Sequence, residues 1–495
     1  MSAAPVVAGL RKSFQQGITK PYEWRRSQLL ALLKLIDENY SDITAALKDD
    51  LNKSEFESRL MEVDTTRNEI VYHLNNLSEW MKPTHVKKTL INSLDTCMIK
   101  PEPYGVALVL GAWNYPLYIA ITPVIGAISA GNCVLLKPSE ISECTSNLLS
   151  KLIPNYLDDR CIKVMMGGIP ETTELLKECF DYIFYTGSTS VGKIIMSAAA
   201  THLTPVTLEL GGKSPVYVDK TCDIPTVANR IMWGKCANSG QTCIAPDFVI
   251  CSPDLQQSLV EALKNSVTKF FGTDVSKSEH YCRIINNQHF LRLKKLLEGQ
   301  KPAFGGDMNE ADKFIAPTVL TDIKPTDQVM ESEIFGPILP ILPMENVQAA
   351  IDYINSRPKP LALYIFSNDS KVVNKFLSET SSGGVCVNDT LMHIALETLP
   401  FGGVGKSGMG AYHGKFSFDT FSHMKSIMWK SQALESINDL RYPPYTEKNM
   451  AWLRRLSKKS VKSKSWLPFS LLGLVLFSAV LLVMTNKDHI MTKFQ

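Results

Sequence analysis

The stretch GVALVLGAWNYPLYIAITPVIGAISAGNCVLLKPSE, residues 105–140, decides the fold. It begins with a continuous apolar run at 105–110 and passes through a loop into small and apolar residues at 118–130. A second apolar run follows at 133–137. Short apolar runs bounded by turn residues are typical of strands buried on both faces, and the longer run between them is typical of a helix. The order predicts a β-α-β unit with parallel strands and a right-handed crossover.

The same alternation continues along the chain. CIKVMMGG (161–168), PETTELLKEC (170–179) and DYIFYTGS (181–188) predict a strand, a helix and a strand. We therefore expect an α/β fold with a Rossmann-like, mostly parallel sheet, preceded by packed helices over residues 22–80. Ligands of such sheets bind at the carboxyl ends of the strands. The loops GAWNYP, LKPSE and YTGSTSVGK should therefore face one site.

Composition excludes several classes of protein. A chain of 495 residues with 45% hydrophobic and 20% charged residues indicates an ordinary globular body of two or more domains. Its eleven cysteines are scattered singly and no signal peptide precedes them, which predicts free thiols in a reducing compartment. The nine histidines show no metal-ligand spacing, so we expect no metal site.

The C-terminal end differs from the body. Residues 465–485, SWLPFSLLGLVLFSAVLLVMT, form an uncharged apolar run of about the 20 residues that a transmembrane helix needs. A basic collar precedes this run, and its Lys/Arg excess predicts that the body lies on the cytosolic side. The alternative is a buried core helix. The collar consists of Arg454, Arg455, Lys458, Lys459, Lys462 and Lys464.

One loop resembles a nucleotide-binding motif only in part. GSTSVGK, residues 187–193, has the glycine and lysine spacing of a P-loop, but Ile194 stands where a P-loop needs Ser or Thr. The G-x-G-x-x-G pattern of dinucleotide sites is also missing from this stretch. What remains is a set of small residues at a helix start, which can approach a phosphate or a ribose.

Three residues could carry chemistry together. Cys243, in NSGQTCIAPD, is a candidate nucleophile, and a working thiolate needs a depressed pKa and a site for oxyanion charge. Glu209 lies between apolar residues before a Gly-Gly turn, where desolvation should raise its pKa and suit it to general-base work. Asn114 is an amide donor after a buried strand. Taken singly, each residue also fits a purely structural role. Cys243 could be a buried thiol, Glu209 a salt-bridged carboxylate and Asn114 a turn residue.

Seven motifs together give a more specific prediction. GAWNYP, LKPSE, TGSTSVGK, LELGGKSP, NSGQTC, ESEIFGP and LPFGGVGKSGMGAYHG occur in the order and approximate spacing of the aldehyde dehydrogenases. The chain therefore resembles that family from about Leu10 to about Lys430. Its short N-terminus and the stretch KFSFDTFSH resemble the class-3 branch, and its hydrophobic tail resembles the membrane-anchored fatty aldehyde dehydrogenases of that branch.

The resemblance implies a catalytic set and a cofactor. It implies that Cys243 attacks the aldehyde, that Asn114 holds the oxyanion, and that Glu209 activates water to release the acid from a thioester. It implies NAD as cofactor, with NADP possible but disfavoured because Glu140 would repel a 2′-phosphate. The cofactor-binding positions that it implies are Lys137, Glu140, Gly187, Ser188, Gly192, Glu333 and Phe335.

The expected substrate is a medium- to long-chain aliphatic aldehyde. Trp113, Tyr115, Trp233 and Tyr412 offer an aromatic lining that suits an apolar chain. The alternatives are an enzyme for aromatic or short-chain aldehydes, a catalytically silent structural relative, and a cysteine hydrolase.

The domain organisation that we expect follows the family. An NAD-binding domain should comprise residues 1–84 and 101–209, and a catalytic domain residues 210–418. Bridging or oligomerisation strands are expected in 85–100 and 419–435, within a homodimer. A basic juxtamembrane segment at 440–464 should precede the anchor at 465–485. The protein should therefore be tail-anchored on the cytosolic face of the endoplasmic reticulum, or of peroxisomes or outer mitochondrial membranes, with no nucleic-acid partner.

Overall fold

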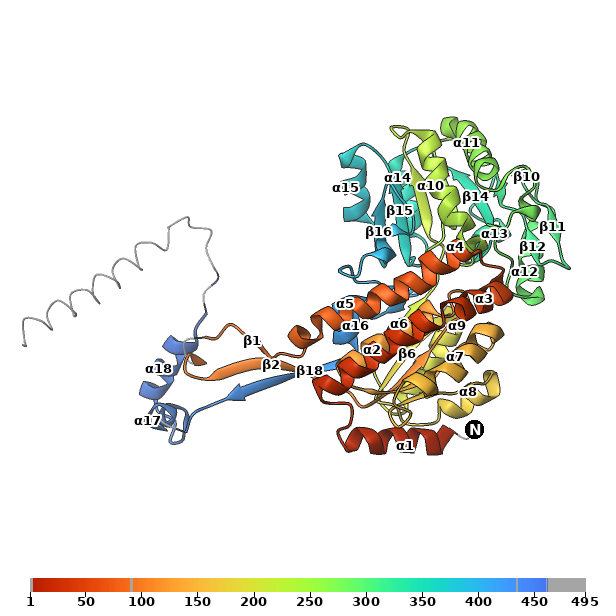
Figure 1. The fold of residues 1–495 in the computed structure, drawn as a ribbon. Helices are drawn as coiled ribbons and strands as arrows, with labels where there is room; N and C mark the ends of the chain where they lie inside the picture. The colour runs from red at the N-terminus through yellow and green to blue at the C-terminus, as the bar shows by residue number, and fades with distance from the viewer. Residues whose placement is uncertain (1–2, 90–91, 433–434, 460, 462–495) are drawn as a thin grey trace, which may run out of the picture. The chain divides into compact units, whose positions relative to one another are not determined.

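The computed structural model describes residues 3–89, 92–432, 435–459 and 461 (Figure 1). Contacts divide the chain into two units, Met1–Thr84 with Met98–Ser426, and His85–Cys97 with Ile427–Gln495. The α-helices are α1 (Ala3–Gln15), α2 (Tyr22–Glu38), α3 (Tyr40–Leu51), α4 (Glu55–Ser58), α5 (Asp64–Trp80), α6 (Tyr118–Ala130), α7 (Glu143–Tyr156), α8 (Ile169–Leu175), α9 (Thr189–Ala200), α10 (Ile224–Cys236), α11 (Pro253–Phe271), α12 (Asn287–Leu297), α13 (Gln328–Glu331), α14 (Val347–Asn355), α15 (Ser370–Glu379), α16 (Gly414–Thr420), α17 (Glu435–Asn438) and α18 (Glu447–Ser457).

The first unit contains a six-stranded sheet with the order β17-β7-β6-β3-β4-β5. Its strands β3 to β7 are parallel, and the short β17 pairs antiparallel with β7. The chain runs from β3 outward to β5 and then returns to place β6 on the other side of β3. This reversal puts the topological switch point between β3 and β6, where open sheets of this type bind ligands. The strands are β3 (Val106–Leu110), β4 (Cys133–Lys137), β5 (Ile162–Val164), β6 (Tyr182–Gly187), β7 (Val206–Leu210) and β17 (Gly408–Met409).

The same unit contains a seven-stranded sheet with the order β10-β13-β14-β9-β8-β15-β16. All its neighbouring strands are parallel except β10, which is antiparallel to β13. The predicted α/β class is thus confirmed. The strands are β8 (Pro215–Val218), β9 (Phe248–Cys251), β10 (Pro302–Phe304), β13 (Thr318–Leu320), β14 (Ile338–Pro343), β15 (Ala362–Phe366) and β16 (Gly384–Val387), with a separate hairpin of β11 (Met308–Asn309) and β12 (Phe314–Ile315).

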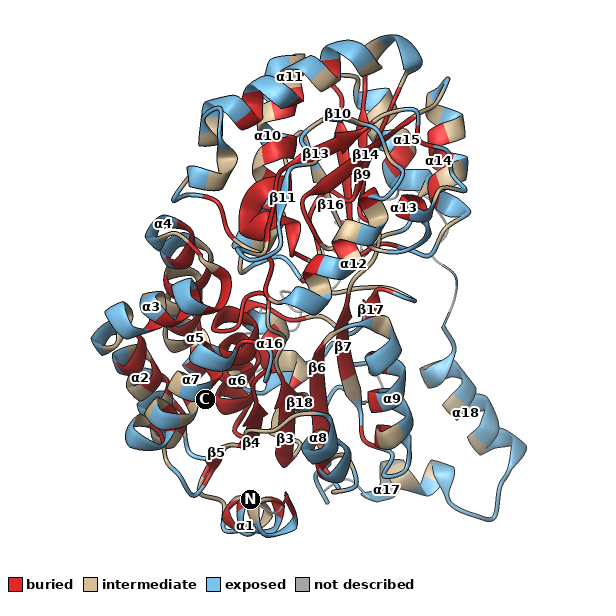
Figure 2. Ribbon diagram, turned by 90° about the vertical axis from the view of Figure 1, so that its right-hand side faces the viewer, coloured by how far each residue is buried: buried red, intermediate tan, exposed pale blue. Residues whose placement is uncertain are grey.

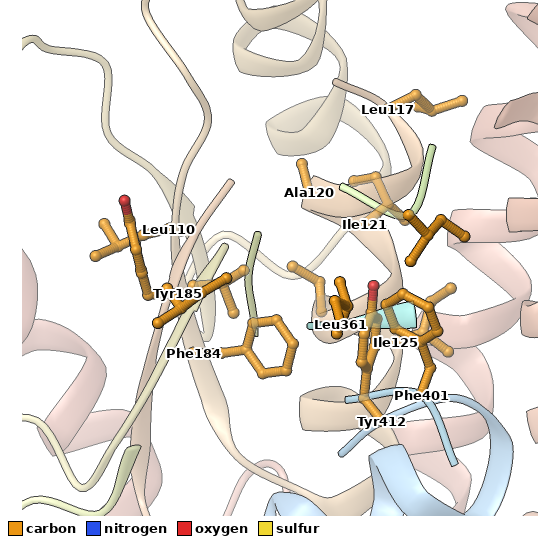
Figure 3. Packing of buried hydrophobic residues seen from close by; sticks show 14 of the residues in the cluster. Leu110, Leu117, Ala120, Ile121, Ile125, Phe184, Tyr185, Leu361, Phe401 and Tyr412 are labelled. Carbon is orange, nitrogen blue, oxygen red and sulfur yellow. The ribbon is translucent and has the colours of Figure 1, made fainter. Parts of the chain in front are cut away.

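The central strands are buried, whereas covering helices such as α11 have exposed outer faces (Figure 2). Helix α6 is buried along its whole length, as its small and apolar residues predict. Figure 3 shows the packing beside it, where Phe184 of β6 lies against Tyr412 with ring centroids 5.1 Å apart, and Tyr412 lies against Phe401 at 5.8 Å.

Three further strands, β1 (Thr84–His85), β2 (Thr96–Pro103) and β18 (Ser422–Trp429), form a small sheet. In the second unit, Lys430 forms an ion pair with Asp95 at 2.7 Å. Helix α18 is capped by Thr446, whose hydroxyl accepts from the main-chain N–H of Asn449. None of the helices in the described part of the chain is long and apolar enough to cross a membrane. The predicted anchor, residues 465–485, lies outside the described residues.

Candidate active site

The loop that carries Cys243 follows α10 and has an unusual backbone. Asn238 and Ser239 both adopt left-handed conformations, with φ of 50° and 51°. Such φ values are costly for residues other than glycine and persist only where surrounding contacts fix them. Here the side chain of Gln241 donates to the main-chain oxygens of Asn238 and Arg283, both at 3.0 Å. The strained loop therefore holds the half-buried Cys243 in a defined position.

Asn114 lies in the loop after β3, at the predicted edge of the sheet. Its side chain is buried, and its amide Nδ2 donates to the main-chain oxygen of Gln241 at 3.0 Å. An amide group has two donor hydrogens, so this bond orients the group and leaves a second hydrogen for another acceptor. The structure thus brings Asn114 against the loop that carries Cys243.

Glu209 is the penultimate residue of β7, and it is buried. Neither of its carboxyl oxygens has a hydrogen-bond partner. Burial raises the pKa of Glu209 well above its usual value, as its apolar neighbours in the sequence predicted. A buried carboxyl group without hydrogen-bond partners is able to bind water or a reacting group.

Two cavities meet at these residues. Cys243 and Glu209, together with Ile119 and Thr186, line both a cavity of about 300 Å³ and a second cavity of about 280 Å³. The nucleophile candidate and the base candidate therefore have access to two different bound groups. A reaction between two bound molecules needs such a junction, because the reacting groups of the protein must reach both molecules.

The first cavity is mainly apolar. Its walls come from the N-terminal helices, from α6 and α10, and from the segment 391–401. Of the four aromatic residues predicted for the substrate, Tyr115, Trp233 and Tyr412 line it. Trp113 instead lines the second cavity, where its ring lies 4.8 Å from His289 and 5.3 Å from Phe335. The other apolar lining residues are Leu60, Met61, Ile119, Ile244, Leu391, Met392, Ile394, Ala395 and Phe401, and Tyr118 adds a further aromatic ring.

The second cavity gathers most of the predicted cofactor residues. Gly187, Ser188, Glu333 and Phe335 line it. Ser188 is also the N-cap of α9, and its hydroxyl accepts from the main-chain N–H of Val191 at 3.4 Å. A helix start of this kind favours an anionic group such as a phosphate.

The remaining predicted cofactor residues lie elsewhere. Gly192 is inside α9, where an added Cβ would come within 2.8 Å of Leu210, so its small size serves the packing of α9 on β7. Lys137 ends β4, and its ammonium donates to Glu140 at 2.6 Å. Lys137 and Glu140 therefore lie at the carboxyl end of β4, the strand that neighbours β3.

A buried ion pair fixes the segment that carries Glu333. The ammonium of Lys213 donates to Asp247 and to the main-chain oxygens of Val329 at 2.9 Å and Ser332 at 3.2 Å. Asp247 in turn accepts from the main-chain N–H of Ile334 at 2.9 Å. Glu333 is thus held between two anchored neighbours.

The pKa of Cys243 differs from what the sequence led us to expect. The sequence argument required a lowered pKa for Cys243, but burial and the charges of Glu333 and Glu209 raise it well above its usual value. Burial and the charge of Asp247 likewise raise the pKa of Glu333 to about 8. The cause is a low-dielectric site in which acidic groups face one another.

These features fit a dinucleotide cofactor. The oxidised nicotinamide ring carries a positive charge, which acidic groups around the second cavity would favour. Arg292 also lines this cavity, but its guanidinium donates to the main-chain oxygens of Ile334 at 2.8 Å and Phe335 at 3.3 Å. At Gly211, an added Cβ would lie within 2.6 Å of the Glu333 carboxyl group. The described residues hold no cluster of three or more metal-ligating side chains.

Sequence reasoning missed several residues of this site. His289 and Arg292 come from α12, which carries none of the quoted motifs. Leu60 and Met61 come from a π-helical turn, Arg59–Val63, between α4 and α5. No spacing relates these positions to Cys243 along the chain, so only the folded structure could reveal them.

Comparison with known proteins agrees with this geometry. The family model described as "Aldehyde dehydrogenase family" matches residues 5–427. The chain belongs to the aldehyde dehydrogenase family. It is 53% identical over 460 residues to aldehyde dehydrogenase family 3 member A2 of Pongo abelii, covering 92% of this chain and 95% of that protein.

Two solved structures are similar to this chain. The substrate-bound AldH of Staphylococcus aureus superposes with a TM-score of 0.90 at 41% identity, covering 92% of this chain and 99% of that one. An aldehyde dehydrogenase of Mycobacterium tuberculosis in complex with NAD⁺ superposes with a TM-score of 0.78 at 25% identity, covering 87% and 91%. This aldehyde dehydrogenase is thus an NAD(P)-dependent oxidoreductase that acts on aldehydes.

The raised pKa of Glu333 predicts a pH-dependent stability. Between pH 4.5 and about 8 the unfolded chain has released a proton that folded Glu333 still binds. Stability therefore falls as the pH rises through this window. Replacing Glu333 by Gln removes this contribution, so the variant should gain melting temperature relative to the wild type from pH 5 to pH 9, without cofactor. The exposed neighbour Glu331→Gln is the control, and a pH-independent difference for Glu333→Gln would contradict the prediction.

Proposed function

We propose that this enzyme oxidises medium- to long-chain aliphatic aldehydes to carboxylic acids with NAD. The observation that carries the proposal is the position of Cys243 and Glu209, which line both the apolar cavity and the cavity that gathers the cofactor residues. An aldehyde whose chain fills the apolar cavity would present its carbonyl group at this junction.

The residues at the junction account for the chemistry. The Sγ atom of Cys243 attacks the carbonyl carbon, and the thiol proton leaves to a base. The carbonyl oxygen becomes an oxyanion, which the free amide hydrogen of Asn114 and the main-chain N–H of Cys243 can stabilise. NAD held by Gly187, Ser188, Glu333 and Phe335 would supply a hydride acceptor, so that loss of hydride from the carbon bound to Cys243 would leave a thioester on this residue. Glu209 then takes a proton from water, whose oxygen attacks the thioester and releases the acid.

The preference for NAD rests on Glu140. Its carboxylate would repel a 2′-phosphate, although the ion pair with Lys137 at 2.6 Å offsets part of this repulsion. We therefore propose NAD as the main cofactor and allow slower use of NADP.

The domains and the location are also proposals. We assign residues 1–84 and 101–209 to cofactor binding, 210–418 to catalysis, and 85–100 with 419–435 to the contact between two copies in a homodimer. The apolar sequence of residues 465–485 and the basic collar before it support tail anchoring in the endoplasmic reticulum membrane, with the body in the cytosol.

The catalytic assignment makes two distinct predictions. Cys243→Ser should lower NADH formation by about 10³-fold or more, because the hydroxyl is a far weaker nucleophile. Glu209→Gln should release one equivalent of NADH in a rapid burst and then turn over slowly, because the thioester forms but is not hydrolysed. Stopped-flow absorbance checks both variants. The exposed Cys144→Ser is the control and should match the wild type, whereas full activity of Cys243→Ser would refute the assignment.

The apolar cavity predicts a dependence on chain length. Each methylene that becomes buried contributes about 0.8 kcal/mol, so kcat/KM should rise about fourfold per carbon until the cavity is full. A C3 to C16 aldehyde series with benzaldehyde measures this dependence. Ile394→Asn should weaken the long chains more than propanal, and Ile394→Val should not. Faster oxidation of benzaldehyde or propanal than of the long chains would favour the alternative, an enzyme for aromatic or short-chain aldehydes.

The tail predicts membrane association. Deleting residues from Trp466 onward should move the enzyme from the membrane pellet to the supernatant with its activity retained, because the apolar run is lost. Deleting only residues 486–495 is the matched control and should leave it in the pellet. A truncated enzyme that still sediments with membranes would show that another part of the chain binds them.

A further inference from the structure

The buried side chain of Lys53 contacts the loop after β3. Lys53 lies between α3 and α4, and its side chain is wholly shielded from solvent. Its ammonium has three donor hydrogens, and the structure gives it three partners. They are the carboxylate of Glu62, the main-chain oxygen of Asn114 at 3.1 Å, and the ring of Tyr115, whose centroid is 3.9 Å away.

Glu62 extends this contact to the start of α6. It lies in the π-helical turn and is completely buried. One carboxylate oxygen accepts from Lys53, and the other accepts from the main-chain N–H groups of Leu117 at 2.9 Å and Tyr118 at 3.3 Å. A carboxylate at this position satisfies donors that a helix start leaves free. One buried ion pair thus fixes the backbone on both sides of Tyr115.

The fixed loop is tied directly to the loop of the nucleophile. The side chain of Asn238 donates to the main-chain oxygen of Asn114 at 2.7 Å, and the amide of Asn114 donates to Gln241 at 3.0 Å. The hydroxyl of Tyr115 lies 2.9 Å from that of Thr242, the residue before Cys243. These three bonds join the two loops across more than 120 residues of sequence.

The main-chain oxygen of Asn114 therefore accepts two hydrogen bonds, one from each side. The bond from Asn238 belongs to the nucleophile loop, and the bond from Lys53 comes from the N-terminal helices. Without the ammonium, the main-chain oxygen of Asn114 would keep its bond from Asn238 but lose the bond that ties it to the N-terminal helices. The amide of Asn114 would then be held less firmly at the place where the oxyanion forms.

We propose that Lys53, paired with Glu62, is a positioning residue that sets the oxyanion-binding amide of Asn114 relative to Cys243. The inference rests on the proposed role of Asn114 and adds a residue that touches neither the aldehyde nor the cofactor. A displacement of about 1 Å at such a group can cost about 100-fold in rate. Lys53 thus acts on catalysis through the position of Asn114.

The test uses the full-length enzyme and a pair of substitutions. Lys53→Met alone leaves Glu62 buried without a partner, so the main variant is Lys53→Met with Glu62→Gln. Methionine keeps most of the length of the side chain without the charge, and glutamine keeps an oxygen for Leu117 and Tyr118. We expect kcat to fall about 10- to 100-fold. The KM for NAD and the rise in melting temperature that NAD causes should stay at wild-type values.

Non-additivity separates positioning from general damage. Asn114→Ala should itself lower kcat about 10²- to 10³-fold. In the Asn114→Ala background, the Lys53→Met/Glu62→Gln change should cost less than about threefold, since the group that it positions is already absent. Arg25→Met is the matched control: Arg25 is a buried cation that donates to Thr19 and Ser129. Any effect of this control on kcat should multiply with that of Asn114→Ala.

Two results would overturn the inference in different ways. If Asn114→Ala slows the enzyme but the Lys53→Met/Glu62→Gln effect multiplies with it, Lys53 does not act through Asn114, and the proposed mechanism stands. If Asn114→Ala turns over at the wild-type rate, the oxyanion role proposed for Asn114 fails together with the role of Lys53. The melting temperature of each variant ensures that kcat refers to folded enzyme.

Discussion

Parallel strands that end at one edge of a sheet are the constraint on which this active site depends. Strands β3, β6 and β7 lie side by side and point the same way, so the residues that follow them must meet. Asn114 follows β3, Ser188 follows β6, and Glu209 lies at the end of β7. The reversal of strand order between β3 and β6 opens space at this edge. Three residues separated by almost a hundred positions in sequence thus converge without any local signal that links them.

The electrostatics of the junction have one physical origin. Cys243, Glu209 and Glu333 are buried acids, and burial is the largest cause of the raised pKa of each, while the charges of Glu333 and Glu209 raise the pKa of Cys243 further. Without a bound cation, the neutral forms are favoured. A positively charged ring in the second cavity would lower the cost of ionising all three groups. The same burial disfavours the thiolate of Cys243 and the carboxylate of Glu209, so both groups bind their protons more tightly than they would in water.

The loops that carry Cys243 and Asn114 are held in place in different ways. The loop of Cys243 adopts left-handed residues at Asn238 and Ser239, which its hydrogen bonds must maintain. The loop of Asn114 has no residue with a left-handed backbone, and the buried Lys53–Glu62 pair forms hydrogen bonds with its main chain. Both loops are then joined by direct hydrogen bonds. A buried ion pair is seldom the most stable choice for a protein core, and its geometric specificity is the better reason for its presence here.

The sequence by itself determined the α/β class, because its apolar runs alternate with helical stretches and end in glycine-rich loops. It also determined the family, because seven motifs agree in order and spacing, and it identified Cys243, Glu209 and Asn114 as candidates. Only the tertiary structure decided that Trp113 faces the second cavity and not the apolar one, that Gly192 serves helix packing, and that the pKa of Cys243 is raised. It alone brought Lys53, Glu62, His289 and Arg292 to the site. The reason is physical: side-chain direction, burial and the charges of neighbours depend on residues distant in sequence, whereas strand and helix patterns depend on residues nearby.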